Sequence, residues 1–593
     1  MKKLLQSRLG IVILLAVAAV IIYAANFLPG RLDLTGEKRF TISQPARQLL
    51  ASLDAPMHIS VLLEGDKLSS GFKKLQNSTI EFLENCRHYS KNQLSYSIVD
   101  AESFINDSVR YPLNDTAKRE WLKANAVKQN EVEKGGTRAI FNYPIALVEY
   151  KDEYATVNLL QGQGNKGFLN PDASMLQYEV INNAEAQLEY NFTSAIQSLT
   201  RTNVPFVAYA MGNGEPDGGE TYDLRQTLRS KYRFYLLNLQ QQPYISDSIK
   251  ALLVVKPKLA FTDDEKLKLD QYIMRGGHVL FLLDALNADM DSLVHNGSEF
   301  TAYSRDLNLD DLLFRYGARI NNDLVQDKQS DMLPQNVGNA GGQPQIEVLP
   351  WPYFPLLYSL SNHPISKNLD AVVMQFPNSV DTVTAAKLDS IIKKDGRVDT
   401  IQIDKVRKEI LLTTSNTSRK QGSPVIVTVE ILKQVENALA YKENNIPLAV
   451  LLEGKFKSLY ANRLSPAMAD SLKASGHDFL AASEKDGKVL VTGDGDWVLN
   501  GFSREGPMEM GANPYTQYKF ANKDFLLNAV EYLTDESGLM ASRSRQFTLR
   551  LLDPKKLEQN KTGWQWLNVG LPLLLVVLAG MVFNYIRKRR YSA

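Results

Sequence analysis

Two aspartates follow a predicted strand near the end of the chain and could bind a cation. Residues 488–492 are predicted to form this strand, and Gly493-Asp494-Gly495-Asp496 comes directly after it. Carboxylates are good ligands for hard cations, but two of them lack the regularly spaced ligands of a calcium-binding loop. A turn capped by aspartates accounts for the same residues. Both interpretations of Asp494 and Asp496 are kept, and the turn is favoured.

A glycine-rich turn, Gly212-Asn213-Gly214-Glu215, follows another predicted strand, residues 204–210. Nucleotide-binding folds hold phosphates at this place, between a strand and a helix. However, the turn lacks the third glycine of a dinucleotide fingerprint and the Lys-Ser/Thr pair of a P-loop, and the Glu215 carboxylate would repel phosphate. We interpret the turn as structural and expect no cofactor, so ATP hydrolysis must belong to another protein.

An aromatic and proline-rich segment, residues 350–360, contains Trp351, Tyr353 and Phe354 and is predicted to be a loop. Its rings could stack on a saccharide or peptide, or they could pack between domains, which is the favoured interpretation. The six histidines show no metal-binding spacing, and Cys86 is the only cysteine, so we expect neither a metal site nor an internal disulfide.

An apolar segment lies near each end of the chain. Residues 10–28 are 19 residues without a charge, enough for a helix of about 28 Å, and residues 565–586 form the second segment. The residues expected to anchor the second segment are Trp564 and Trp566 at its start and Arg587, Lys588, Arg589 and Arg590 after it. The positive charges predict two transmembrane helices with both chain ends (1–9 and 587–593) in the cytoplasm and the rest outside it. A cleaved signal peptide is the alternative for the first segment.

The composition limits the possible partners. With 67 basic and 66 acidic residues the net charge is +1, and no long run of one sign stands between the apolar segments, so nucleic acid is not an expected partner. A chain of 593 residues is too long for one core. We therefore predict an α/β ectodomain of several domains.

The element pattern gives the expected domains. Residues 32–202 read as βαβαββα, which resembles the thioredoxin fold, with Pro144 where that family has its cis-proline; no Cys-x-x-Cys is present, so the resemblance is to a non-redox domain. Residues 203–385 show a parallel α/β pattern that resembles class I glutamine-amidotransferase-like domains, without their nucleophilic cysteine. Residues 386–480 are predicted as a smaller β-containing insertion or subdomain. Residues 481–555 should supply the closing strand and helix.

Over nearly its whole length the chain resembles the GldG family of gliding-motility ABC-transporter auxiliary proteins. The resemblance rests on the order of short motifs, which are Asp33-Leu34-Thr35, 37–43 (EKRFTIS), 62–66 (LLEGD), Gly214-Glu215, Gly276-Gly277, 312–318 (LLFRYGA), 324–327 (LVQD) and 493–496 (GDGD). It implies a bacterial inner membrane with the bulk of the chain in the periplasm. It also implies a multi-span ABC permease and a cytoplasmic ATPase as partners.

We therefore predict a non-enzymatic auxiliary subunit that couples the permease and ATPase to an envelope protein, a glycan or a substrate. Glu215, Trp351, Tyr353, Phe354, Asp494 and Asp496 are the candidate partner or ligand surface. The alternatives are a saccharide- or peptide-binding subunit of the transporter and a cryptic envelope hydrolase that would depend on Glu215 or Asp494.

Overall fold

The structure is a computed structural model with a mixed α/β architecture and several separate sheets. It describes residues 41–65, 68–106, 114–133, 136–161, 174–201, 203–295, 299–340, 342–383, 406–428, 440–474, 476–504, 506–544 and 561–591. The chain divides into two compact units, Met1–Gln546 and Phe547–Ala593, and each is described by itself.

The first part of the larger unit is built on a four-stranded sheet in the order β2-β1-β5-β6. β1 is parallel to β2 and antiparallel to β5, which is antiparallel to β6. The elements are α2 (Gln44–Ala51), β1 (Met57–Val61), α3 (Ser70–Tyr89), β2 (Leu94–Ile98), α4 (Ala101–Asn106), α5 (Asp115–Ala124), β3 (Val127–Glu133), β4 (Gly136–Asn142), β5 (Ile145–Tyr150), β6 (Glu153–Asn158) and α7 (Ser174–Thr200).

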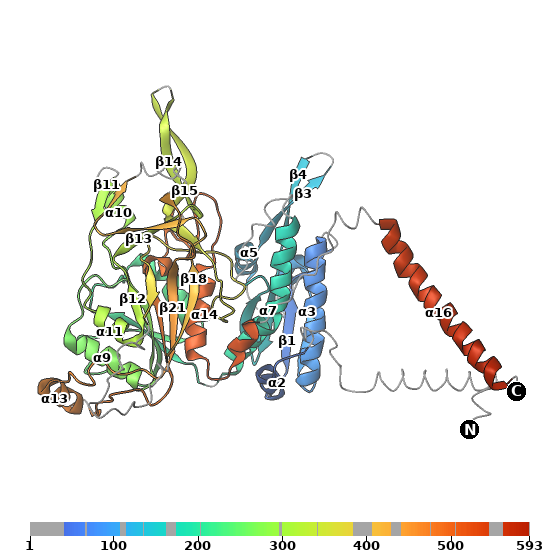
Figure 1. The fold of residues 1–593 in the computed structure, drawn as a ribbon, viewed down its shortest axis with the longest axis horizontal. Coiled ribbons are helices and arrows are strands. Elements are labelled where there is room, and N and C mark those ends of the chain that lie inside the picture. Colours follow the sequence, from blue (N-terminus) through green and yellow to red (C-terminus); the bar gives the residue numbers. More distant parts are fainter. Residues whose placement is uncertain are drawn as a thin grey trace. The chain divides into compact units, whose positions relative to one another are not determined.

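Helices cover both faces of this sheet (Figure 1). The core shared by α2, α3 and α7 contains Ile59 and Val148 from alternate strand positions, whereas Leu147 faces α4 and α5. Ser43 caps α2 as its place before the helix predicts, because its hydroxyl accepts the N–H of Ala46 at 3.4 Å.

The sequence pattern places one long strand over residues 139–150, and this prediction is wrong. The chain is interrupted at Pro144, so β4 pairs with β3 as a separate hairpin and β5 begins at Ile145. Proline has no N–H to donate to a sheet, which explains the break. Among the described residues the one cis peptide precedes Pro424, not Pro144.

The second part is a seven-stranded sheet in the order β18-β21-β22-β10-β9-β7-β8. The five strands from β22 to β8 are parallel, and β21 is antiparallel to both of its neighbours. The strands are β7 (Phe206–Met211), β8 (Arg233–Asn238), β9 (Ile249–Val255), β10 (His278–Leu282), β18 (Val406–Thr413), β21 (Pro447–Gly454) and β22 (Gly487–Thr492).

Helices lie on both faces of the seven-stranded sheet. One face packs against α8 (Tyr222–Arg229) and α14 (Asn522–Thr534), and the other against α9 (Asp263–Met274) and α11 (Asp310–Tyr316). The predicted Thr262–Glu265 capping box is present at the start of α9, and Gly276 ends that helix with a φ of +93°. The remaining described helices are α10 (Met290–His295), α13 (Pro466–Ala474) and the 3-10 helices η1 (Gly219–Thr221), η4 (Asp496–Val498) and η5 (Leu539–Ser544).

The late strand β22 lies inside this sheet, between β10 and β21, as the sequence suggested for its last strand. β18 and β21 come from the segment expected to be a smaller subdomain, residues 386–480, yet both extend the main sheet. The domain boundaries themselves stay predictions.

A third layer consists of the remaining described strands, which form small separate sheets outside the seven-stranded sheet. They are β11 (Glu299–Ala302), β12 (Ala318–Ile320), β13 (Asp323–Asp327), β14 (Ser330–Ala340), β15 (Gln343–Leu357), β16 (Val372–Val373), β17 (Val380–Thr382), β19 (Ser418–Gly422), β20 (Val425–Thr428), β23 (Phe502–Ser503) and β24 (Gly506–Pro507). β14 and β15 form the long hairpin at the top of Figure 1. The predicted loop at 350–360 is therefore wrong, since most of it is strand β15.

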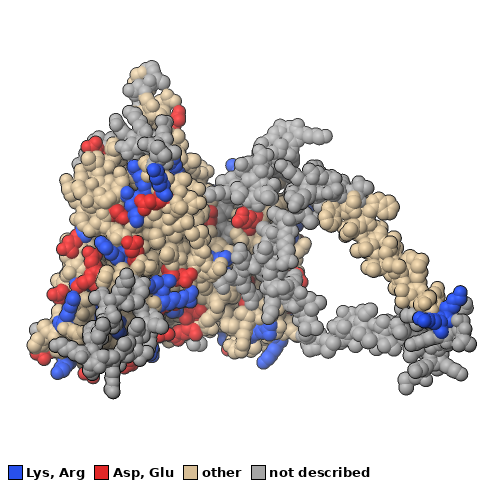
Figure 2. Space-filling view, in the orientation of Figure 1, with Lys and Arg blue, Asp and Glu red and all other residues tan. Residues whose placement is uncertain are grey.

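The smaller unit contains α16 (Lys561–Tyr591), drawn mostly in tan with basic residues at one end in Figure 2. Gly563–Arg589 is long and apolar enough to cross a membrane, with a mean hydropathy of 2.2 in its most apolar stretch. Among the described residues this is the single candidate span, so two flanking spans are not seen. The first apolar segment, residues 10–28, lies outside the described residues.

Candidate functional site

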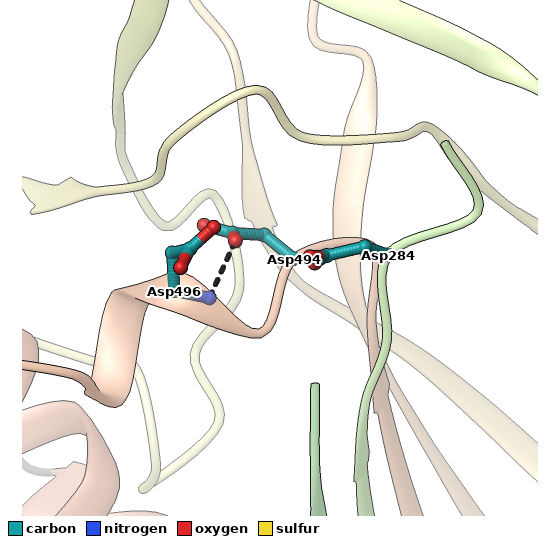
Figure 3. A group of neighbouring side chains, drawn as sticks. All are labelled: Asp284, Asp494 and Asp496. Atoms are coloured by element: carbon teal, nitrogen blue, oxygen red, sulfur yellow. Dashed lines mark hydrogen bonds between the residues drawn. The ribbon is translucent and has the colours of Figure 1, made fainter. Parts of the chain in front are cut away.

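Three adjacent parallel strands end in charged residues at one edge of the main sheet. The register pairs Val255 of β9 with Leu282 of β10, and Leu282 with Thr492 of β22. Because the strands end level with each other, Lys256, Asp284 and the turn 493–496 meet there. One carboxylate oxygen from each of Asp284, Asp494 and Asp496 lies within 4.8 Å of the others (Figure 3).

Backbone N–H groups hold two of these carboxylates in place. Asp494 accepts the N–H of Asp496 at 2.7 Å through one oxygen and that of Gln375 at 2.8 Å through the other. Asp284 accepts the N–H of Gly495 at 2.7 Å. The Asp494–Asp496 hydrogen bond is that of an aspartate-capped turn, which is the favoured interpretation of the sequence.

Lys256 supplies a positive charge inside the group. Its ammonium contacts both carboxylate oxygens of Asp496 and lies 3.5 Å from Asp284, and its side chain is 9% exposed. The backbone of Lys256 is left-handed, with a φ of +44°, which is uncommon for a residue with a side chain. The sequence interpretation missed both Lys256 and Asp284. The available signal was that each is the first charged residue after a buried strand.

Burial and neighbouring charges shift the pKa values of these groups. Burial raises the pKa of Asp494 well above its usual value, and the neighbouring Asp496 and Asp284 add to this effect. Burial also raises the pKa of Asp496, to about 6, although the ammonium of Lys256 acts in the opposite direction. Burial alone would lower the pKa of Lys256, but the Asp496 and Asp284 carboxylates raise it. The group therefore contains an ion pair between Lys256 and Asp496, and burial favours the protonated form of Asp494.

Among the described residues, the three clustered carboxylates of Asp284, Asp494 and Asp496 are of the type that could bind a divalent cation. The ammonium of Lys256 already occupies the position of a counter-ion between two of them. Lys256, Asp284, Asp494 and Asp496 together connect the ends of β9, β10 and β22, and we call this group the charged lock. We assign no chemical step to it.

Other segments of the chain lie very close to the two glycines of this turn. The N–H of Asn378 donates to the carbonyl of Gly493 at 2.6 Å, and a Cβ added at Gly493 would lie 1.9 Å from the carbonyl oxygen of Asn378. A Cβ at Gly495 would lie 2.6 Å from Cβ of Lys256. The two glycines of the GDGD motif are thus required by close approach of other segments.

Glu215 lies at the end of β7 and outside this group. It is 5% exposed, its side chain accepts the N–H of Asn213 at 2.8 Å, and its other carboxylate oxygen is buried without a hydrogen-bond partner among the described residues. Burial raises the pKa of Glu215, and the nearby Glu265 adds to the shift. Glu215 therefore shapes the glycine-rich turn from within and does not form an exposed partner surface.

The three aromatic residues of 350–360 lie in a core, so they are packed, which is the interpretation that the sequence favoured over a stacking surface. Trp351, Tyr353 and Phe354 are 2%, 1% and 5% exposed, and they pack with Phe300 and Phe376 in one core. The rings belong to strand β15 of the third layer, so their area is used in packing. They cannot stack on a ligand without opening that core.

The predicted anchoring residues lie on α16. Trp564 and Trp566 are 51% and 74% exposed near its start, and Arg587, Lys588, Arg589 and Arg590 lie in its last turns. Tryptophan at one end and basic residues at the other suit the two interfaces of a membrane.

A family model described as an ABC-type uncharacterized transport system matches residues 205–529, more than half of the chain. A model of a domain of unknown function, DUF7088, matches residues 36–149. No curated protein matches the sequence.

Several solved structures show a similarity, of which three are given. The N-terminal domain of mmIFT52 has 16% identity and a TM-score of 0.28, with 56% of this chain and 97% of that domain covered. A ThuA-like protein from Parabacteroides merdae has 10% identity and a TM-score of 0.24, covering 56% of this chain and 90% of its own. The exo-β-1,4-mannosidase Op5Man5 of an Opitutaceae bacterium has 10% identity and a TM-score of 0.19, covering 64% of this chain and 44% of its own.

Proposed function

Because the chain belongs to the family described as an ABC-type uncharacterized transport system, we propose that it is a membrane-anchored, non-enzymatic auxiliary subunit of an ABC transporter. The family match carries this proposal. The second support is α16, a helix suited to cross a bilayer and to lie beside the spans of a permease. The ATPase would be reached through that permease.

A coupling role is consistent with the way the described carboxylates are used. Asp284, Asp494 and Asp496 are engaged by backbone N–H groups and by Lys256, so they hold strands together. Cys86 is buried, and burial raises the pKa of its thiol well above the usual value, which disfavours the thiolate that redox or nucleophilic chemistry needs. These features support a subunit that transmits motion or recruits an envelope partner.

The domain types, the second membrane span, the location and the partners are part of the same proposal. The strand order β2-β1-β5-β6, with β1 parallel to β2, supports a thioredoxin-like domain without redox function, and the five parallel strands flanked by helices support an amidotransferase-like domain. Membership in the gliding-motility group, a second span at 10–28, a periplasmic bulk and a permease and ATPase as partners are proposed on the sequence resemblance.

The saccharide- or peptide-binding alternative loses the surface on which it was based, since Trp351, Tyr353 and Phe354 are buried. The hydrolase alternative relies on Glu215 or Asp494. Turnover of envelope polymers by the purified chain that is abolished by Asp494→Asn, while the variant stays folded, would favour it over a coupler.

Copurification tests the transporter assignment. The full chain, tagged at its amino end, is isolated from gently solubilised membranes of its own host, and the bound proteins are identified by mass spectrometry. A control chain carries an unrelated single-span helix in place of α16. We expect a multi-span permease and an ATPase with the native chain and much less of both with the control. Recovery of neither with the native chain would contradict the proposal.

Thiol labelling of intact spheroplasts tests the topology, and the chain is suited to it because Cys86 is its one cysteine and is fully buried. Gly501 is exposed with open space around it, so Gly501→Cys should be labelled by a membrane-impermeant maleimide from outside. Ser592→Cys should be labelled only after the membrane is permeabilised. The opposite pattern would reverse the proposed orientation.

A further inference from the structure

A cavity of about 350 Å³ lies away from the charged lock, near the start of β22. It is lined by the loop 362–364, by β18, by the end of α14 and by η5. Its polar lining includes His363, Arg407, Glu409, Lys488, Tyr532 and Asp535. The volume is in the range of pockets for small ligands.

His363 lines this cavity and has a hydrogen-bond donor that the described chain does not use. The residue is 5% exposed, and its Nδ1 accepts the N–H of Ile365 at 3.3 Å, so in the neutral ring the proton lies on Nε2. Burial lowers the pKa of His363 to about 4, which keeps the ring neutral at physiological pH. Nε2 is buried and has no hydrogen-bond partner within the described chain. A buried donor without an acceptor is unfavourable, and a ligand oxygen would correct it.

The carboxylates around the cavity are already engaged by the protein. Glu409 accepts the hydroxyl of Ser361 through one oxygen and the guanidinium of Arg407 at 3.1 Å through the other. Both oxygens of Asp535 accept backbone N–H groups of the turn that leads into η5, at 2.8 and 3.0 Å. Part of the capacity of these carboxylates to accept hydrogen bonds is therefore already used.

The lining also offers hydrogen-bond donors. Lys488 donates to the carbonyl of Tyr532 at 2.7 Å and lies 4.2 Å from the centre of that ring, which leaves N–H bonds of the ammonium for a ligand. Arg407 is 65% exposed and stands where a ligand would enter. Glu453 lies opposite both Arg407 and Lys488 in the sheet and accepts the hydroxyl of Tyr532 at 2.6 Å, so with Glu409 and Asp535 three carboxylates surround the two cations. A single negative charge therefore meets less repulsion there than the double charge of phosphate.

We propose that this cavity binds a small ligand through a carboxylate group, of the kind found at the free end of a peptide, with the His363 Nε2–H and the Lys488 ammonium as donors and Arg407 at the entrance. The proposal does not depend on the transporter assignment. The cavity is bordered by η5, and Arg543 of η5 also donates to the carbonyl of Pro364 at 2.9 Å. An occupied cavity would thus fix the segment that precedes the membrane helix in the sequence.

Calorimetric titration of the purified full chain in detergent micelles tests this inference. The probe is N-acetylglycine, which has a carboxylate, and the matched control is N-acetylglycinamide, which has nearly the same shape without the charge. Inorganic phosphate is the third probe. We expect N-acetylglycine to bind and the other two to bind at least about tenfold more weakly, since charged hydrogen bonds are the stronger ones.

Two variants locate the site. His363→Phe keeps a ring against Tyr532 but removes the donor, and Arg407→Gln changes an exposed residue that should not be needed for folding. Each should weaken N-acetylglycine at least about tenfold, the loss expected for one charged or buried hydrogen bond. A wild-type chain that does not bind N-acetylglycine would overturn the proposal. Equal binding of the amide or phosphate, or an unchanged affinity in a folded Arg407→Gln chain, would do so as well.

Discussion

Replacement of Lys256 by methionine should destabilise the larger unit in a way that depends on pH. Lys256 is the cation paired with Asp496 and Asp284, and its side chain is 9% exposed, so methionine would fill similar space but leave two buried carboxylates without a counter-ion. Removing one partner of a buried ion pair typically costs about 3–5 kcal/mol. We expect a loss of this size at pH 8.

The direction of the pH effect follows from the pKa of Asp496. That pKa is raised from 3.8 to about 6 in the folded chain, so the folded state keeps its proton when the unfolded state has lost it. The corresponding stability is fully present below pH 3.8 and is lost as the pH rises through 6. Without Lys256 the pKa rises further, which extends the loss above pH 6. The deficit of Lys256→Met should therefore be smaller at pH 5 than at pH 8.

Urea unfolding at the two pH values, followed by tryptophan fluorescence, measures the effect, because Trp497 is buried directly after this turn. Lys266→Met is the matched control. Lys266 is also buried and pairs with Asp311 at 2.7 Å, but Asp311 is 44% exposed and returns to water when the lysine is removed. The control should lose about 1 kcal/mol or less, with little change between pH 5 and 8. An equal deficit of Lys256→Met at both pH values, or one no larger than that of the control, would refute the reasoning.

Two further outcomes follow from single contacts. Gly493→Ala should unfold the chain at a markedly lower temperature, because its Cβ would lie 1.9 Å from the backbone of Asn378, whereas Gly501→Ala, with nothing within 4 Å, should melt like the wild type; equal melting temperatures for the two variants would count against the close approach. Tyr190→Phe removes a buried hydrogen bond of 2.7 Å to Glu531 that links α7 to α14, so it should lower the free energy of unfolding by about 1–3 kcal/mol; urea unfolding measures this, and an unchanged midpoint would show that the link contributes nothing.

Several local elements follow from neighbouring residues alone. Neighbouring residues predict the Thr262–Glu265 capping box, the Ser43 cap and the buried strand before Asp284. The reason is that helix caps and side-chain periodicity depend on residues close in sequence. The long apolar run at 565–586 likewise predicted a helix, and α16 covers it. Errors arose where proline stands within the sheet layers, as at Pro144, since the local pattern does not tell which strand will pair.

How these elements contact each other depends on the folded chain as a whole. The sequence places Lys256 far from Asp496, and only the parallel register of β9, β10 and β22 makes them an ion pair. Likewise, an aromatic segment such as 350–360 can be a ligand surface or a core, and the choice depends on what packs over it. Here Phe300 and Phe376 cover the rings. Burial and long-range pairing are properties of the whole chain, so no window of neighbouring residues specifies them.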